Sequence, residues 1–73
     1  MKDIADELRA ACKDAKKGDT VVTIHLFGIA HAERLKGLDL KALAARAGIS
    51  ETYGTELRKG VRLAEYVKIT SKP

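Results

Sequence analysis

The sequence has few of the residues that usually stiffen a chain of 73 residues. It contains one cysteine, one proline, no tryptophan and only three other aromatic side chains. A single cysteine cannot form a disulfide within the chain, and no cysteine cluster suggests structural zinc. No apolar stretch approaches the roughly 18 residues needed to span a bilayer. We therefore expect a fold without disulfide or metal ion, and no membrane association.

The composition that remains is typical of a small globular domain. Charged residues make up 33% of the chain and hydrophobic residues 45%, with 14 Lys and Arg against 10 Asp and Glu. This is too apolar for a disordered chain. A domain of about 60 residues buries only about 60% of the surface that it exposes when unfolded, so its own core gives marginal stability. A second copy of the chain is the simplest further support, and we expect a homodimer.

Other functional signals are sparse. The N-terminal segment 1–7 is acidic where a signal peptide would be basic, which together with the single cysteine predicts a cytoplasmic protein. Cys12 is expected to pack as a small hydrophobic residue, with a redox or dimer-linking role as the alternative. His25 and His31 are six residues apart, on different faces of a helix. The sequence contains no catalytic or phosphate-binding motif, so we predict no enzyme activity, no cofactor and no small-molecule ligand.

Apolar periodicity and glycine positions predict one all-α domain over residues 1–73, with four helices at about 3–17, 20–36, 39–47 and 51–60. The first has apolar residues on one face, acids in its first turn and lysines in its last, and Gly18 follows as a stop. Gly37, Gly48 and Gly60 are expected to end the other three helices in the same way.

Two segments leave their secondary structure open. Residues 20–24 are mostly β-branched, which favours a strand, yet no turn signal separates them from the helical pattern that follows. We prefer one buried helix over about 20–36, with a strand over 20–27 as the alternative. Such an apolar helix must be covered on several sides, by the first helix and by a partner subunit. Residues 65–70 alternate and indicate either a short strand or a continued helix.

Residues 39–60 have the spacing of a helix-turn-helix. This motif needs a small residue where the second helix crosses the first, and a turn residue that tolerates a positive φ. Ala44 and Gly48 meet these two demands. The space between the helices is expected to be filled by Leu40, Leu43, Ala47, Ile49 and Leu57.

The run L-A-x-x-A-G-I-S-x-x-Y over residues 43–53 resembles the phage Cro and repressor (XRE-like) family of DNA-binding domains, and the resemblance extends over about residues 28–60. It implies that the second helix of the motif lies in the major groove of double-stranded DNA. The sequence departs from the family at three points. The N-terminal helix is additional, there is no room for the later helices after Gly60, and Gly54 replaces a β-branched core residue.

The resemblance also implies roles for individual side chains. The base-facing residues would be Glu51, Thr52, Thr55 and Glu56. Ser50 and Tyr53 would contact sugar or phosphate, and Arg58, Lys59 and Arg62 would hold the DNA backbone. Residues 58–73 hold five Lys or Arg and one Glu, which suits phosphate binding. A glutamate can read cytosine through its amino group, although acidic readers are uncommon.

These residues also allow structural interpretations. Glu51 would stabilise a helix N-terminus whatever the helix binds, and Glu56 could pair with Lys59. Tyr53 could fill the space beside Gly54, which itself either permits a close backbone approach or weakens the helix. We therefore predict a sequence-specific, dimeric transcriptional regulator that uses helix 51–60 as recognition helix. The alternative is a helix-turn-helix-derived module for protein interaction that does not bind DNA.

Overall fold

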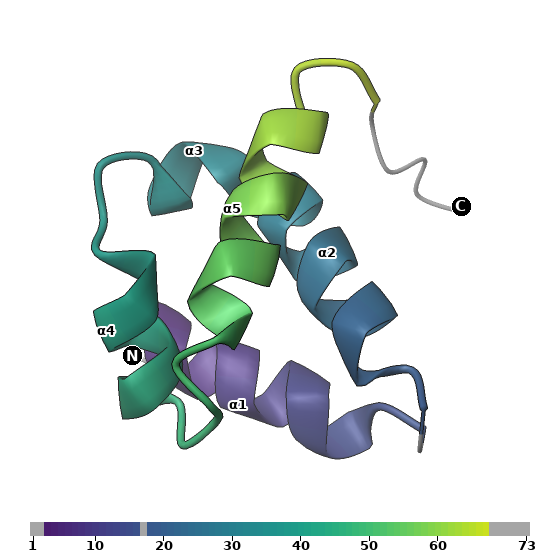
Figure 1. Cartoon of the computed structure of the whole chain (residues 1–73), viewed down its shortest axis with the longest axis vertical. Helices are drawn as coiled ribbons and strands as arrows, with labels where there is room; N and C mark the ends of the chain where they lie inside the picture. Colours follow the sequence, from purple (N-terminus) through teal and green to yellow (C-terminus); the bar gives the residue numbers. More distant parts are fainter. Residues whose placement is uncertain (1–2, 17, 68–73) are drawn as a thin grey trace.

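The computed structural model describes residues 3–16 and 18–67. These residues form five helices and no strand, which confirms the predicted all-α class. The helices are α1 (Ile4–Asp14), α2 (Thr20–Ala30), α3 (Ala32–Leu35), α4 (Leu40–Arg46) and α5 (Tyr53–Leu63). Helix α5 crosses the front of the molecule in Figure 1, with α2 behind it on one side, α4 on the other and α1 across the lower end.

Helix α1 forms as its sequence predicts. The Asp3 carboxylate accepts a hydrogen bond from the Asp6 backbone N–H at 3.0 Å, which caps the first turn. The helix buries Ala5 and Leu8 against the core and ends at Asp14, slightly before the predicted end at residue 17. Gly18 then adopts a φ of +92° between α1 and α2.

The helix predicted over 20–36 is interrupted at His31. Residues 20–27 are helical, which excludes the strand alternative, but the helix divides into α2 and α3. His31 has φ −115° and ψ 25°, outside helical geometry, and its ring centroid lies 4.4 Å from that of Phe27. The bend allows Ala32 and Leu35 to be buried in the core beside α5. The apolar pattern of the sequence is continuous across this bend, so periodicity alone predicts a single helix.

Helices α2 and α5 touch at their backbones. A Cβ atom on Gly28 would lie 2.8 Å from the Leu57 carbonyl oxygen, and a Cβ atom on Gly60 would lie 2.5 Å from the His25 carbonyl oxygen. Both distances are too short for any side chain. Gly60 therefore lies inside α5 as part of a helix crossing, and the prediction that it ends the helix is wrong because α5 continues to Leu63.

Gly54 has the same function between α4 and α5. A Cβ atom there would lie 2.8 Å from the Lys41 Cα atom and 2.9 Å from its nitrogen. Of the two interpretations of this glycine, the close backbone approach is the one observed. It also explains why the β-branched residue of the Cro and repressor pattern is absent, since the space for it does not exist.

The sequence predicts either a strand or a continued helix over residues 65–70. After α5, the backbone N–H of Glu65 bonds to the Arg62 carbonyl at 3.1 Å and that of Tyr66 bonds to the Leu63 carbonyl at 2.8 Å, so these residues form a turn. The rest of the predicted segment, from residue 68, lies outside the described residues. Within the described ranges, no helix is both long enough and apolar enough to cross a bilayer.

Candidate nucleic-acid interface

The α4–α5 unit has the geometry of a helix-turn-helix. The Asp39 carboxylate caps α4 by accepting a hydrogen bond from the Ala42 N–H at 3.1 Å. Ala44 is fully buried, and Gly48 has a φ of +81° in the turn. The Ile49 N–H closes the turn on the Ala44 carbonyl at 3.1 Å. The positive φ predicted for Gly48 is confirmed and the small Ala44 is buried, whereas the close approach of the two helix backbones lies at Lys41 and Gly54.

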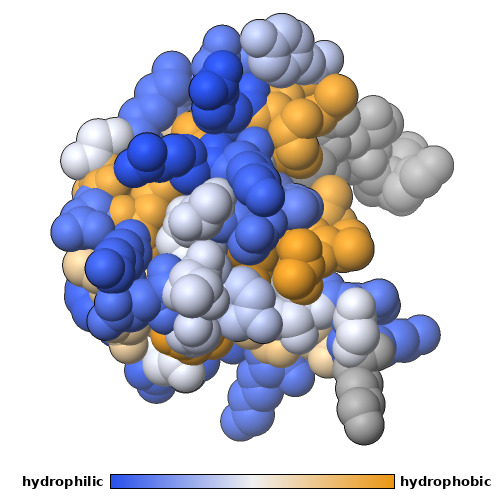
Figure 2. Space-filling model, viewed as in Figure 1, coloured by the Kyte–Doolittle hydropathy of each residue, from blue (hydrophilic) through white to orange (hydrophobic). Residues whose placement is uncertain are grey.

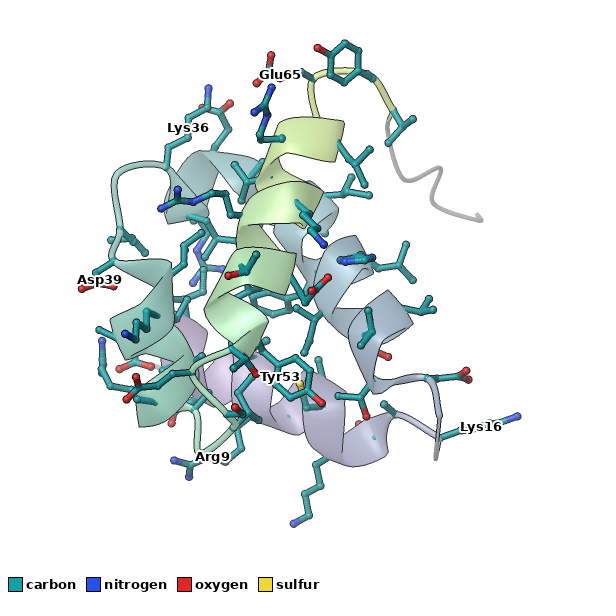
Figure 3. All side chains as sticks on the ribbon, viewed as in Figure 1. Arg9, Lys16, Lys36, Asp39, Tyr53 and Glu65 are labelled. Carbon is teal, nitrogen blue, oxygen red and sulfur yellow. The ribbon has the colours of Figure 1, made fainter. Side chains whose placement is uncertain are left out.

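Helix α1 supports the turn through Arg9, a residue that the sequence analysis does not single out. Its Nε donates to the Ala47 carbonyl and its Nη2 to the Arg46 carbonyl, both at 3.2 Å. These carbonyls belong to the end of α4, where backbone acceptors lack partners within the helix. Arg46 in turn pairs with Asp3 at 2.7 Å. Figure 3 shows Arg9 at the end of the molecule where the turn lies. The additional N-terminal helix is therefore part of the motif's support.

Residues 50–52 lead into α5 as a turn, so the helix begins at Tyr53, two residues later than predicted. The Ser50 hydroxyl lies 2.8 Å from that of Thr52 and accepts from the Thr52 N–H at 3.3 Å. Glu51 pairs with Lys41 at 3.7 Å, and both side chains are exposed. An exposed pair of this kind is weak, so both groups remain available to a ligand.

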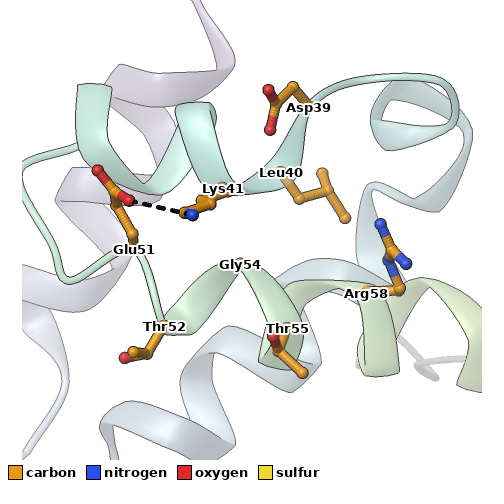
Figure 4. A pocket seen from close by; sticks show the side chains of 8 residues that line it. All are labelled: Asp39, Leu40, Lys41, Glu51, Thr52, Gly54, Thr55 and Arg58. Carbon is orange, nitrogen blue, oxygen red and sulfur yellow. Dashed lines mark ion pairs between the residues drawn. The ribbon is translucent and has the colours of Figure 1, made fainter.

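A pocket lies between the start of α4 and the start of α5, and Figure 4 shows the side chains around it. Gly54 gives it a floor without a side chain, while Thr55 and Arg58 line it from α5. The remaining lining residues are Asp39, Leu40, Lys41, Glu51 and Thr52. The pocket thus joins the exposed residues of the predicted base-facing set to Lys41, which the sequence analysis does not include.

Two of the predicted contact residues are turned towards the protein. Tyr53 is half-buried and packs against the core. The Glu56 carboxylate lies 2.7 Å from His25 Nε2 on α2 and 3.5 Å from Lys59 Nζ, and its side chain is only 24% exposed. This position differs from the base-facing one predicted for Glu56 and agrees with the alternative of pairing with Lys59. The hydrogen bond with His25 lowers the pKa of Glu56, and the Lys59 charge lowers it further.

The lowered pKa of Glu56 predicts a dependence of stability on pH. A carboxyl group whose pKa is lowered by folding stabilises the folded state at every pH above its ordinary pKa, which for glutamate is 4.5. This contribution is lost as the pH falls through the lowered pKa of the folded state. We expect the free energy of unfolding to fall more steeply below about pH 4.5 in the wild type than in Glu56→Gln. Urea denaturation at several pH values measures both slopes. Glu33→Gln removes an exposed carboxylate and serves as control; equal slopes in wild type and Glu56→Gln would contradict the prediction.

The basic residues of α5 differ in their availability. Lys59 pairs with Glu56. Arg58 and Arg62 are exposed and, within the described part of the chain, form no ion pair. They are four residues apart and therefore neighbours on one helix face. This face presents two guanidinium groups to solvent.

The comparison with known proteins agrees with this motif. Residues 1–70 match a protein family described as an HTH-like domain. The chain belongs to the HTH-like domain family. No curated protein and no solved structure matches it. The match to this HTH-like domain includes α1, in agreement with the contacts of Arg9, and it supports a helix-turn-helix family in general rather than the Cro and repressor type in particular.

Proposed function

We propose that this HTH-like domain is a sequence-specific, double-stranded DNA-binding protein and a small dimeric transcriptional regulator of the cytoplasm, without enzyme activity. Its mode of binding would be that of the Cro and repressor type, with α5 in the major groove. The observation that carries the proposal is the presence on the second helix of the motif of two exposed arginines, Arg58 and Arg62, that form no ion pair with any residue the structure describes.

The chemistry of these arginines suits DNA phosphates. Contacts with phosphate provide most of the affinity of DNA-binding proteins. A guanidinium group donates two parallel hydrogen bonds to a phosphate, and among residues 3–16 and 18–67 neither Arg58 nor Arg62 is paired with an acid that it would have to give up first. The chain also carries a net charge of +4, which favours encounter with DNA.

Base contacts would come from the side chains at the start of α5. Thr55 is exposed one turn before Arg58, and Thr52 is exposed at the entry to the helix. Hydroxyl groups read either donors or acceptors on base edges. On binding DNA, Glu51 would leave its weak ion pair with Lys41 and accept a hydrogen bond from a cytosine amino group. Lys41 would then be available to bind a neighbouring phosphate or guanine. The proposed contact set is thus Ser50, Glu51, Thr52, Thr55, Arg58, Arg62 and Lys41, with Lys59 secondary.

Selection of binding sites from random DNA at low salt tests this function. We expect one enriched sequence with related half-sites about one DNA turn, or roughly 34 Å, apart, since a dimer presents two recognition helices. Binding of the selected DNA should weaken steeply as salt rises. Enrichment of no sequence, together with no shift of any DNA at about 50 mM salt, would overturn the proposal.

A protein-interaction module is the second candidate. It is favoured by the engagement of Glu56 with His25 on α2, which removes one predicted reader from the outer face. The same selection separates the two functions, because an interaction module would retain no DNA at any salt concentration.

A further inference from the structure

A second surface, next to the side of α5 that carries Arg58 and Arg62, is strongly apolar. We call it the α2–α5 apolar face. It consists of Val21, Val22 and Leu26 on α2 together with Leu63, Tyr66 and Val67 at the end of α5. Each of these side chains is at least 41% exposed, and Tyr66 is 76% exposed. In Figure 2, hydrophobic side chains gather on the side of the molecule where α2 and the end of α5 meet solvent.

The six residues form one surface because His25 connects the two helices. Together with Leu63, Tyr66 and two basic residues, His25 lines a shallow, mainly apolar depression. On α2, Val21 and Val22 lie four and three residues before His25 and are its helical neighbours, and Leu26 is in turn a neighbour of Val22, which lies four residues before it. The exposed apolar area of the face is on the order of 500 Å². Patches of this size on small proteins commonly mark a site of interaction.

The face has two parts. The end of α5 and the turn that follows it extend beyond α2 at the top of Figure 1, while α2 runs below them. Leu63 and Tyr66 belong to this projection because they lie at the end of α5 and in the turn after it, and Val22 and Leu26 belong to α2. A two-fold interface requires both features on the same molecule.

Charge also favours a second copy as the occupant. Between Thr20 and Ala30, α2 has no Asp, Glu, Lys or Arg, so the α2 part of the face can be covered without burying a charge of that helix. At the borders of the face, Arg62 and Glu65 are both exposed. A two-fold arrangement allows Arg62 of one copy to approach Glu65 of the other in an exposed and therefore weak pair, which Arg62 would give up on binding a DNA phosphate, although the chain as a whole is positive at +4.

We propose that the α2–α5 apolar face binds a second copy of this chain, with the projection of each copy seated on α2 of the other. This covers the exposed side of α2, which a monomer leaves in water. The proposal identifies the dimer surface of the proposed regulator and rests on that function only for its biological role. Self-association itself is measured without DNA, so the two proposals can fail separately.

Sedimentation equilibrium of the full chain without DNA, from about 10 μM to about 1 mM, tests the proposal. We expect a wild-type dimer with a dissociation constant in the micromolar range. Leu26→Glu should weaken it at least ~100-fold, because each copy would bury an unpaired carboxylate in the interface. Tyr66→Ala should weaken it at least ~10-fold, as is common for a tyrosine that anchors an interface. Far-UV circular dichroism verifies that each variant remains folded.

Leu38→Glu is the matched control. Leu38 is 44% exposed, close to the 48% of Leu26, but it lies between α3 and α4, outside the face. It should leave the dimer unchanged. A wild-type chain that stays monomeric at about 1 mM would overturn the proposal, whether another protein or a further segment of the chain covers the face. A folded Leu26→Glu variant that dimerises as well as wild type, or is weakened no more than Leu38→Glu, would also overturn it.

Discussion

Gly60→Ala is expected to lower the free energy of unfolding by about 3 kcal/mol, enough to unfold much of a marginal domain. The added methyl would lie 2.5 Å from the His25 carbonyl oxygen and 3.0 Å from the Gly28 Cα atom. Both neighbours are backbone atoms, so relief requires α2 and α5 to move apart along their crossing. Alanine normally stabilises a helix interior by up to ~1 kcal/mol relative to glycine. Helix propensity alone therefore predicts that Gly60→Ala raises the free energy of unfolding, so the sign of the measured change shows which of the two effects is larger.

Gly18→Ala provides the comparison. Its methyl would meet nothing within 4 Å, so the only cost is that of a positive φ, here +92°, at roughly 1–2 kcal/mol. Urea denaturation followed by far-UV circular dichroism gives both free energies. A Gly60→Ala variant more stable than Gly18→Ala would mean that α2 and α5 do not touch at their backbones.

Replacing Arg58 and Arg62 on α5 is expected to have the second large effect, on DNA binding. We expect Arg58→Ala/Arg62→Ala to weaken binding to every DNA sequence by about 100-fold at moderate salt. The slope of log affinity against log salt should decrease by about 2, because each lost phosphate contact contributes about 0.9. Fluorescence anisotropy with the selected DNA and with unrelated DNA measures both quantities. The preference for the selected DNA should remain, because phosphate contacts do not read sequence.

Lys13→Ala/Lys16→Ala is the control for net charge. This double variant also removes two positive charges, from exposed positions at the end of α1 and just beyond it. Both positions are away from Arg58 and Arg62, and Figure 3 shows Lys16 on the opposite side of the molecule from the α4–α5 turn. An equal loss of affinity in the two double variants would show that total charge, and not the α5 face, determines binding. Because Arg62 also borders the apolar face, Arg58→Ala alone gives the effect on DNA without involving the dimer.

The features that follow from local sequence were predictable. The periodicity of α1, the small Ala44 and the positive φ of Gly48 each depend on a few neighbouring residues. The bend at His31 was not predictable, because the apolar pattern runs through it and the bend serves tertiary packing. Gly60 shows the same limit: a glycine near the end of a pattern indicates a stop, unless it is known that Gly28 of another helix lies against it.

The DNA contacts of the candidate site stay a prediction, and the structure adds the exposure and the partners of the residues. Thr55, Arg58 and Arg62, whose roles the family resemblance implied, are exposed on α5. Glu56 instead faces His25, which is 31 residues away in the chain, and Arg9 supports carbonyls 37 and 38 residues away. Pairs of such separation leave no local pattern, so a single sequence does not reveal them.

Helix α5 continues through Gly60, without a break, from the proposed DNA contacts to the apolar face. A helix of 11 residues is about 16 Å long. In the proposed dimer each α5 carries DNA contacts at its start and part of the interface at its end, so the interface fixes where the two sets of DNA contacts lie relative to each other. In such a dimer the rigid α5 helix, and not a flexible linker, would determine the spacing of the operator half-sites.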